Sequence, residues 1–207
     1  MGTIQKLREL TPVRALTLPE ALRIAELQAS RLLTISGITQ PPVAEHIIAG
    51  LPRLQVERIK LAGLSGAAEW SHGRWLIILN GTEVPTRQRF SLAHEFKHVL
   101  DNPFIDVLYP RVHAMSPADR AEAVCDYFAG CLLMPRRWLT RHWKGGQQDS
   151  RTLAALYDVS GAAMRVRLTQ IGLAVGNERH QPGTFNERLD ASPNIYRRRQ
   201  EDSPCPR

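Results

Sequence analysis

The chain has 207 residues, a net charge of +7, a pI near 9.8 and 43% hydrophobic residues, enough for a packed core. No apolar run approaches the roughly 18 residues that suggest a membrane span, and the opening MGTIQKLREL lacks the apolar stretch of a signal peptide. Three cysteines without a C-x-x-C spacing favour a reducing compartment, so we expect a cytoplasmic protein that contacts no membrane.

Periodicity and capping residues predict helices over residues 17–38 and 43–51, separated by two consecutive prolines. Three β-like runs follow at residues 54–61, 67–71 and 75–80. Glycine-containing turns separate these runs, so the predicted sheet is small and antiparallel. The last run, WLIILN, is the most apolar, and a peptide substrate could bind along it as an added strand. Trp75 and Ile77 are its candidate substrate contacts.

The next predicted helix, residues 86–100, contains an H-E-x-x-H sequence at His94, Glu95 and His98. Histidines four residues apart lie one above the other on one helix face, where both rings can bind one zinc ion. Glu95 is turned about 100° from His94, so it can act on a water molecule beside the metal as a general base. This pattern is typical of a hydrolytic zinc site.

An apolar stripe supports this interpretation of the helix. It consists of Leu92, Phe96, Val99 and Leu100, which fall on the side opposite the two histidines and are expected to pack inward. Glu95 and Lys97 flank the metal face on either side. Lys97 is therefore a candidate for contacting an acidic or carbonyl-rich part of a substrate.

A helix predicted over residues 117–134 offers a third ligand. Glu122 and Asp126 are four residues apart on one face, and the longer Glu122 is the better candidate for the metal. Asp126 suits a supporting role, accepting the ring N–H of a zinc-binding histidine. We expect the core residues of this helix on the opposite faces: Val124, Cys125, Phe128, Cys131 and Leu132. Less regular candidate ligands are His72, His113, His142 and His180.

Beyond this helix we expect short helices over residues 136–142, 150–157 and 160–170, the last two capped by Ser150 and Ser160. The final pair could form a helix-turn-helix in which Arg165 and Arg167 face phosphates, but a helical cap or substrate-docking lobe is favoured. Residues 176–207 are rich in proline and poor in apolar residues, which predicts a disordered tail. The predicted division is a metallopeptidase domain at 1–140, a helical lobe at 141–175 and the tail.

Two segments, RQRFSLAHEFKHVLD (residues 87–101) and AEAVCDYFAGCLLMP (residues 121–135), resemble the ImmA/IrrE family of zinc-dependent endopeptidases. The resemblance extends over about residues 12–175. It implies that His94, His98 and Glu122 are zinc ligands and that Glu95 is the catalytic base. It also implies a helix-turn-helix repressor as substrate. The chain departs from the pattern at Lys97, where many members have glycine, and at Cys125, where alanine is frequent.

Together these observations predict an α+β fold with a zincin-like (gluzincin-type) core and a C-terminal helical lobe, acting as a site-specific zinc endopeptidase. Tyr109 and His113, on the connection between the two metal helices, are further candidates for substrate contact. The alternative is a non-catalytic regulator with a vestigial metal site that binds DNA or protein, such as a toxin–antitoxin or phage partner. The net positive charge is compatible with an acidic partner or a weak nucleic-acid contact.

Overall fold

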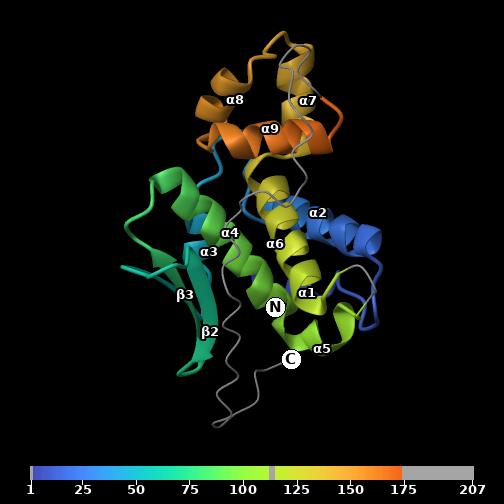
Figure 1. Ribbon diagram of the computed structural model, residues 1–207, viewed down its shortest axis with the longest axis vertical. Helices are drawn as coiled ribbons and strands as arrows, with labels where there is room; N and C mark the ends of the chain where they lie inside the picture. Colours follow the sequence, from blue (N-terminus) through green and yellow to red (C-terminus); the bar gives the residue numbers. More distant parts are fainter. Residues whose placement is uncertain (1, 112–114, 174–207) are drawn as a thin grey trace.

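The structure is a computed structural model that describes residues 2–111 and 115–173 of the chain (Figure 1). Its elements are α1 (Thr3–Arg8), α2 (Leu18–Ile35), α3 (His46–Ala49), β1 (Leu54–Ile59), β2 (Gly66–Ser71), β3 (Arg74–Asn80), α4 (Pro85–Asp101), a 3-10 turn (Asn102–Phe104), α5 (Ile105–Leu108), α6 (Pro117–Leu133), α7 (Arg136–Lys144), α8 (Ser150–Tyr157) and α9 (Gly161–Gln170). The architecture is mixed α+β, as predicted. The candidate ligands His113 and His180 and the predicted disordered tail lie outside the described residues.

Side-chain caps explain where several helices begin. The Thr17 hydroxyl accepts a hydrogen bond from the Glu20 N–H, and the Glu20 carboxylate accepts one from the Thr17 N–H, which forms a capping box at the start of α2. Ser160 caps α9 as predicted. Helix α8 is capped by Asp149 and not by Ser150, which is already its first helical residue.

The three strands form one sheet in the order β1-β3-β2. A tight turn joins β2 to β3, so these strands are antiparallel, as predicted. Strand β1 pairs with β3 in parallel, with Leu54 opposite Trp75 and Ile59 opposite Asn80. The all-antiparallel prediction was therefore wrong for β1, because the chain places β2 on the far side of β3 before returning through the middle of the sheet.

The central position of β3 also corrects the predicted substrate strand. Both edges of β3 are hydrogen-bonded to neighbouring strands, so no peptide can add to it. Trp75 is 3% exposed and Ile77 is fully buried, so their side chains belong to the core and do not face a substrate.

Helices α4 and α6 lie side by side, with the sheet on one side of the pair and α2 on the other (Figure 1). The four residues of the predicted apolar stripe, Leu92, Phe96, Val99 and Leu100, are each at most 1% exposed, which confirms that stripe. The Phe96 and Phe128 rings meet across the helix pair with centroids 6.3 Å apart. Because each such buried side chain contributes about 1.5–3 kcal/mol, this packing holds the two helices in fixed rotation.

Helices α7, α8 and α9 form a group at one end of the molecule (Figure 1). Arg167 in α9 is 1% exposed. Its Nε donates to the Met134 carbonyl oxygen at 3.1 Å, and its guanidinium lies 5.2 Å from the Tyr127 ring centroid. In the helix-turn-helix alternative Arg167 would face phosphates, but here its side chain anchors α9 to α6, which disfavours that alternative. Arg165 is exposed on α9.

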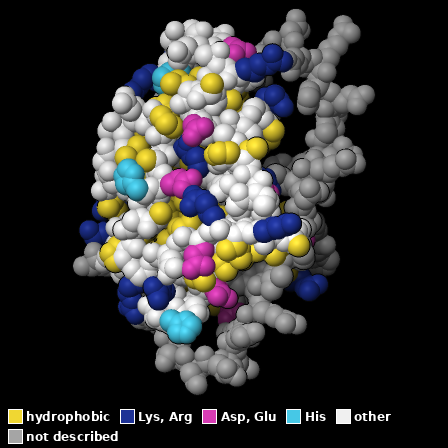
Figure 2. Space-filling view, turned by 90° about the vertical axis from the view of Figure 1, so that its left-hand side faces the viewer, with side chains coloured by type: hydrophobic (Ala, Val, Ile, Leu, Met, Phe, Trp, Pro, Cys, Tyr) yellow, Lys and Arg dark blue, Asp and Glu magenta, His cyan; other side chains and the backbone are white. Residues whose placement is uncertain are grey.

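Charge is mixed on the side of the molecule nearest the sheet. Figure 2 shows Lys and Arg side chains interspersed with Asp and Glu on this face, among hydrophobic residues. The described residues on this face therefore form no patch of a single charge sign. Among the described helices, none has the length and hydrophobicity needed to cross a membrane.

Candidate metal centre

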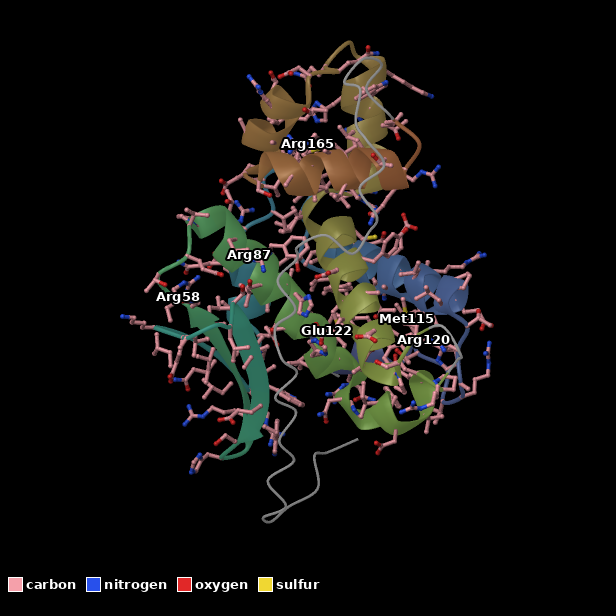
Figure 3. The ribbon with its side chains drawn as sticks, in the orientation of Figure 1. Arg58, Arg87, Met115, Arg120, Glu122 and Arg165 are labelled. Atoms are coloured by element: carbon pink, nitrogen blue, oxygen red, sulfur yellow. The ribbon has the colours of Figure 1, made fainter. Side chains whose placement is uncertain are left out.

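Three donor side chains converge where α4 faces α6. His94 and His98 come from consecutive turns of α4, and their Nε2 atoms are 3.1 Å apart. Figure 3 shows Glu122 on α6, beside α4; its carboxylate oxygens lie 3.1 Å from His94 Nε2 and 3.3 Å from His98 Nε2. His72 and His142, two other candidate ligands, lie in the β2–β3 turn and in α7.

Asp126 lies one turn after Glu122 and contacts the other side of the His94 ring. Its Oδ1 is 2.8 Å from His94 Nδ1, so it can accept the ring N–H and direct Nε2 toward Glu122. A carboxylate in this position fixes the tautomer and orientation of a metal-binding histidine. The structure places Asp126 against the ring as expected, and its role in supporting a metal-binding histidine stays a prediction.

The charges of this cluster fit a divalent cation. Burial disfavours a charged His94 ring, but hydrogen bonds to Asp126 and Glu122 prevail and raise the pKa of His94 to about 10. Burial alone would raise the pKa of Glu122, yet the hydrogen bonds from both histidines hold that pKa far below its usual value. The carboxylates thus draw positive charge to this point. Two imidazoles and one carboxylate are a donor set that zinc accepts.

Glu95 lies between the two histidines in sequence and contacts the start of β2. A Cβ atom on Gly66 would lie 3.0 Å from Glu95 Cγ and 3.2 Å from its Oε1, so only glycine lets the strand pass this close. Burial raises the pKa of Glu95. The sequence analysis assigned the glycines between the β-like runs to turns and did not foresee the contact of Gly66 with the candidate base.

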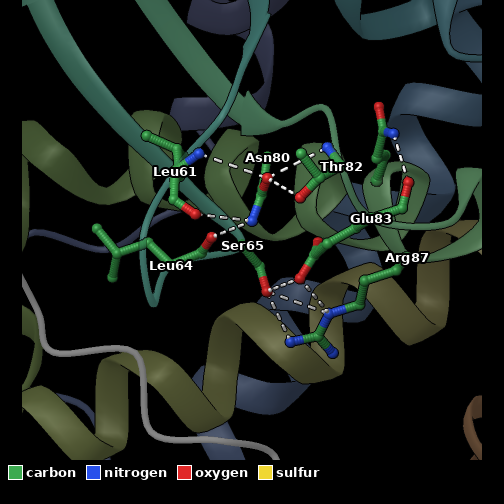
Figure 4. Close-up of polar contacts among 8 residues, drawn as sticks. Leu61, Leu64, Ser65, Asn80, Thr82, Glu83 and Arg87 are labelled. Atoms are coloured by element: carbon green, nitrogen blue, oxygen red, sulfur yellow. Dashed lines mark hydrogen bonds and ion pairs between the residues drawn. The ribbon is translucent and has the colours of Figure 1, made fainter.

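A buried asparagine, also missed from the sequence, holds the loop that leads to β2 (Figure 4). Asn80 Nδ2 donates to the carbonyl oxygens of Leu61 and Leu64, each at 3.1 Å. Its Oδ1 accepts a hydrogen bond from Thr82 Oγ1 at 2.7 Å. The sequence signal that could have revealed this role is the single polar residue at the end of the apolar run WLIILN, where the chain leaves the sheet.

The same loop is tied to the start of α4. Ser65 Oγ donates to Glu83 at 2.7 Å and accepts from Arg87 Nη2 at 3.0 Å (Figure 4). Since Ser65 directly precedes Gly66, these contacts fix the position of β2 relative to the helix that carries Glu95.

The Lys97 and Tyr109 side chains are both buried, and both contact Asp101. Lys97 is 1% exposed and pairs with the buried Asp101 one turn along α4. The Tyr109 hydroxyl donates to the same carboxylate. The expected substrate contacts were therefore wrong for both residues, because the side of α4 that carries Lys97 is covered by the core and its charge is neutralised there.

Cys125 is buried, as predicted, but it is not on a face opposite the acids. It follows Glu122 by three residues, which places the two side chains about 60° apart on the helix. Its sulfur and one ring nitrogen from each of His94 and His98 all lie within 4.8 Å of one another. Burial raises the pKa of this thiol well above its usual value.

A family model and two curated relatives match this chain. The family model described as the IrrE N-terminal-like domain matches residues 52–169. The radiation response metalloprotease IrrE of Deinococcus radiodurans is 26% identical over 161 residues, which cover 74% of this chain and 48% of the relative. The protein of the same name from Deinococcus deserti is 29% identical over 160 residues, covering 73% and 56%. The chain thus spans about half the length of these curated relatives.

A solved structure, that of a Mycobacterium tuberculosis transcriptional regulator, matches with a TM-score of 0.58 and 17% identity. The match covers 81% of this chain and 51% of that chain, and it concerns the fold alone. The family match extends over more than half of the chain and includes both helices of the metal centre. The chain therefore belongs to the ImmA/IrrE family of metallopeptidases.

Proposed function

We propose that the chain is a zinc-dependent, site-specific endopeptidase in which His94, His98 and Glu122 bind zinc and Glu95 is the general base. The observation that carries the proposal is the convergence of three nitrogen and oxygen donors from α4 and α6, all within 3.3 Å of one another. Glu95 adjoins these donors on α4. Membership of a metallopeptidase family supports the same activity.

In such a site zinc supplies Lewis acidity that polarises the scissile carbonyl. Glu95 accepts a proton from the attacking water and then delivers it to the leaving nitrogen. Burial raises the pKa of Glu95, which makes its carboxylate a stronger proton acceptor than an exposed one. Asp126 holds the His94 ring, while Gly66 keeps β2 close enough to limit the positions available to the Glu95 carboxylate.

The substrate segment is expected along β2 and not along β3. In the described part of the chain β2 is an edge strand of the sheet, and its first residue, Gly66, contacts Glu95. An extended peptide added to this edge would bring its backbone next to the base. Helix α4 carries Glu95 and packs on the sheet, with the edge strand β2 beside it. This arrangement supports a zincin-like core. The α7–α9 group, residues 136–170, would serve as a docking lobe, and the boundary predicted at residue 140 falls within α7.

A helix-turn-helix repressor is the proposed substrate, on the basis of the family resemblance. The test is to incubate the zinc-loaded chain with the helix-turn-helix protein encoded beside its gene and to determine intact masses. We expect one cleavage site in that protein and none in casein. Cleavage of both at comparable rates would refute the specificity.

The matched control is Glu95→Gln, which is nearly isosteric but cannot accept the proton from water. We expect this variant to keep zinc and fold while losing cleavage. Cleavage at the wild-type rate would show that Glu95 is not the base, and loss of zinc would contradict the ligand assignment. Steeply salt-dependent DNA binding without any cleavage would favour the non-catalytic alternative.

A further inference from the structure

We propose that the Cys125 sulfur is a fourth donor to the metal ion, beside His94, His98 and Glu122. The inference rests on the proposed function in one respect, that the two histidines bind a metal. It goes beyond that proposal because three donors already suffice for a catalytic zinc site. The observation behind it is that the sulfur and a ring nitrogen of each histidine lie within 4.8 Å of one another.

The helix geometry allows Cys125 and Glu122 to bind the same ion. Residues three apart on a helix are neighbours on its surface, and both side chains belong to the part of α6 that faces α4. In a tetrahedral site with zinc–sulfur and zinc–nitrogen bonds of about 2.3 and 2.0–2.1 Å, sulfur and nitrogen lie about 3.6 Å apart. The Cys125 sulfur lies within 4.8 Å of each histidine nitrogen, so it would need to move closer by at most roughly 1.2 Å. Small side-chain rotations can supply such a movement.

Burial restricts what this sulfur can bind. Cys125 is 1% exposed, so bulk water and external ligands do not reach its thiol. On binding, the thiol gives up its proton and the sulfur enters as thiolate. A thiolate favours zinc, and still more cadmium, over harder ions such as magnesium.

The consequence is a closed resting site. Two imidazoles, one carboxylate and one thiolate complete a tetrahedral set, whereas a catalytic zinc site keeps one position open. Water or the substrate carbonyl would therefore have to enter as a fifth ligand or displace the sulfur. The resting form would bind zinc more tightly than a three-donor site.

The test is zinc X-ray absorption spectroscopy on the full, zinc-loaded chain. We expect one zinc–sulfur distance at about 2.3 Å, separate from the nitrogen and oxygen shell at about 2.0–2.2 Å. The sulfur shell should disappear in Cys125→Ala. It should remain in Cys131→Ala, which removes another buried thiol of α6, and in Cys205→Ala, outside the described residues. Cobalt-loaded protein should likewise show sulfur-to-cobalt charge-transfer absorption only where Cys125 is present.

Chelator competition gives a second measurement. Loss of a supporting contact to a ligand already costs about 10–100-fold in metal affinity, so loss of a donor should weaken zinc binding in Cys125→Ala at least tenfold. A wild-type spectrum with nitrogen and oxygen shells only would overturn the role of Cys125 while leaving the proposed function intact. A chain that binds no zinc in the wild type or in either control would overturn both. Because the wild-type spectrum decides the matter, a poorly folding Cys125→Ala would not prevent the test.

Discussion

Replacing Lys97 by methionine should destabilise the fold strongly, because Lys97 is one half of a buried ion pair. The Lys97 and Asp101 side chains are 2% and 1% exposed and form an ion pair within α4. Methionine fills a similar volume but removes the positive charge. The Asp101 carboxylate would then remain buried, with the Tyr109 hydroxyl still donating a hydrogen bond to it.

The expected loss follows from this burial. Removing one partner of a buried ion pair costs about 3–5 kcal/mol, because the remaining charge is left without compensation. The hydrogen bond from Tyr109 persists, so we expect about 3 kcal/mol, at the lower end of that range. With a urea dependence of about 2 kcal/mol per M, the unfolding midpoint should fall by roughly 1.5 M. Urea unfolding followed by circular dichroism measures this shift.

Two controls separate the buried pair from the substitution itself. Lys144→Met makes the same change at an exposed position of α7 and should alter the free energy of unfolding by less than about 0.5 kcal/mol. The double variant Lys97→Met/Asp101→Leu removes both charges and should recover most of the loss, since apolar replacements of buried pairs are often neutral. A shift in Lys97→Met no larger than that in Lys144→Met would refute the reasoning.

Three further predictions concern other parts of the chain. Asp126→Asn should weaken zinc binding by about 10–100-fold in chelator competition, because a neutral amide oxygen holds the His94 ring N–H less strongly than a carboxylate does; unchanged affinity would contradict this role. Gly66→Ala should keep zinc but slow cleavage by about 100-fold, since its Cβ would displace the Glu95 carboxylate; a wild-type rate would show that the contact is idle. The hydrogen bond from Arg14 lowers the pKa of Glu20 from 4.5 to about 2. Wild type should therefore exceed Glu20→Gln in thermal unfolding midpoint at pH 6, with the difference narrowing as pH falls from 4.5 to about 2; a constant difference would contradict this.

Much of the candidate site follows from local spacing. The distance from His94 to His98 is one helical turn, so any helix over this segment places both rings on one face. The apolar residues of the same segment face the opposite way, and they are buried as that pattern predicts. The acids of α6 have the same spacing, which is why a second set of donors could be expected there. These features depend only on the helical period, which the sequence alone reveals.

Long-range packing determines the features of the site that local spacing does not. The order β1-β3-β2 depends on where the chain crosses the sheet, so the accessible edge could not be read from strand patterns, and neither could the contact between Gly66 and Glu95. Lys97 and Cys125 each lie at the border of a helix face. Whether such a side chain meets solvent, core or metal site depends on which neighbouring element covers that border. A rotation of α4 or α6 by a few tens of degrees about its axis would change the surroundings of these side chains. That rotation is set only by the packing of the two helices against each other, the sheet and α2.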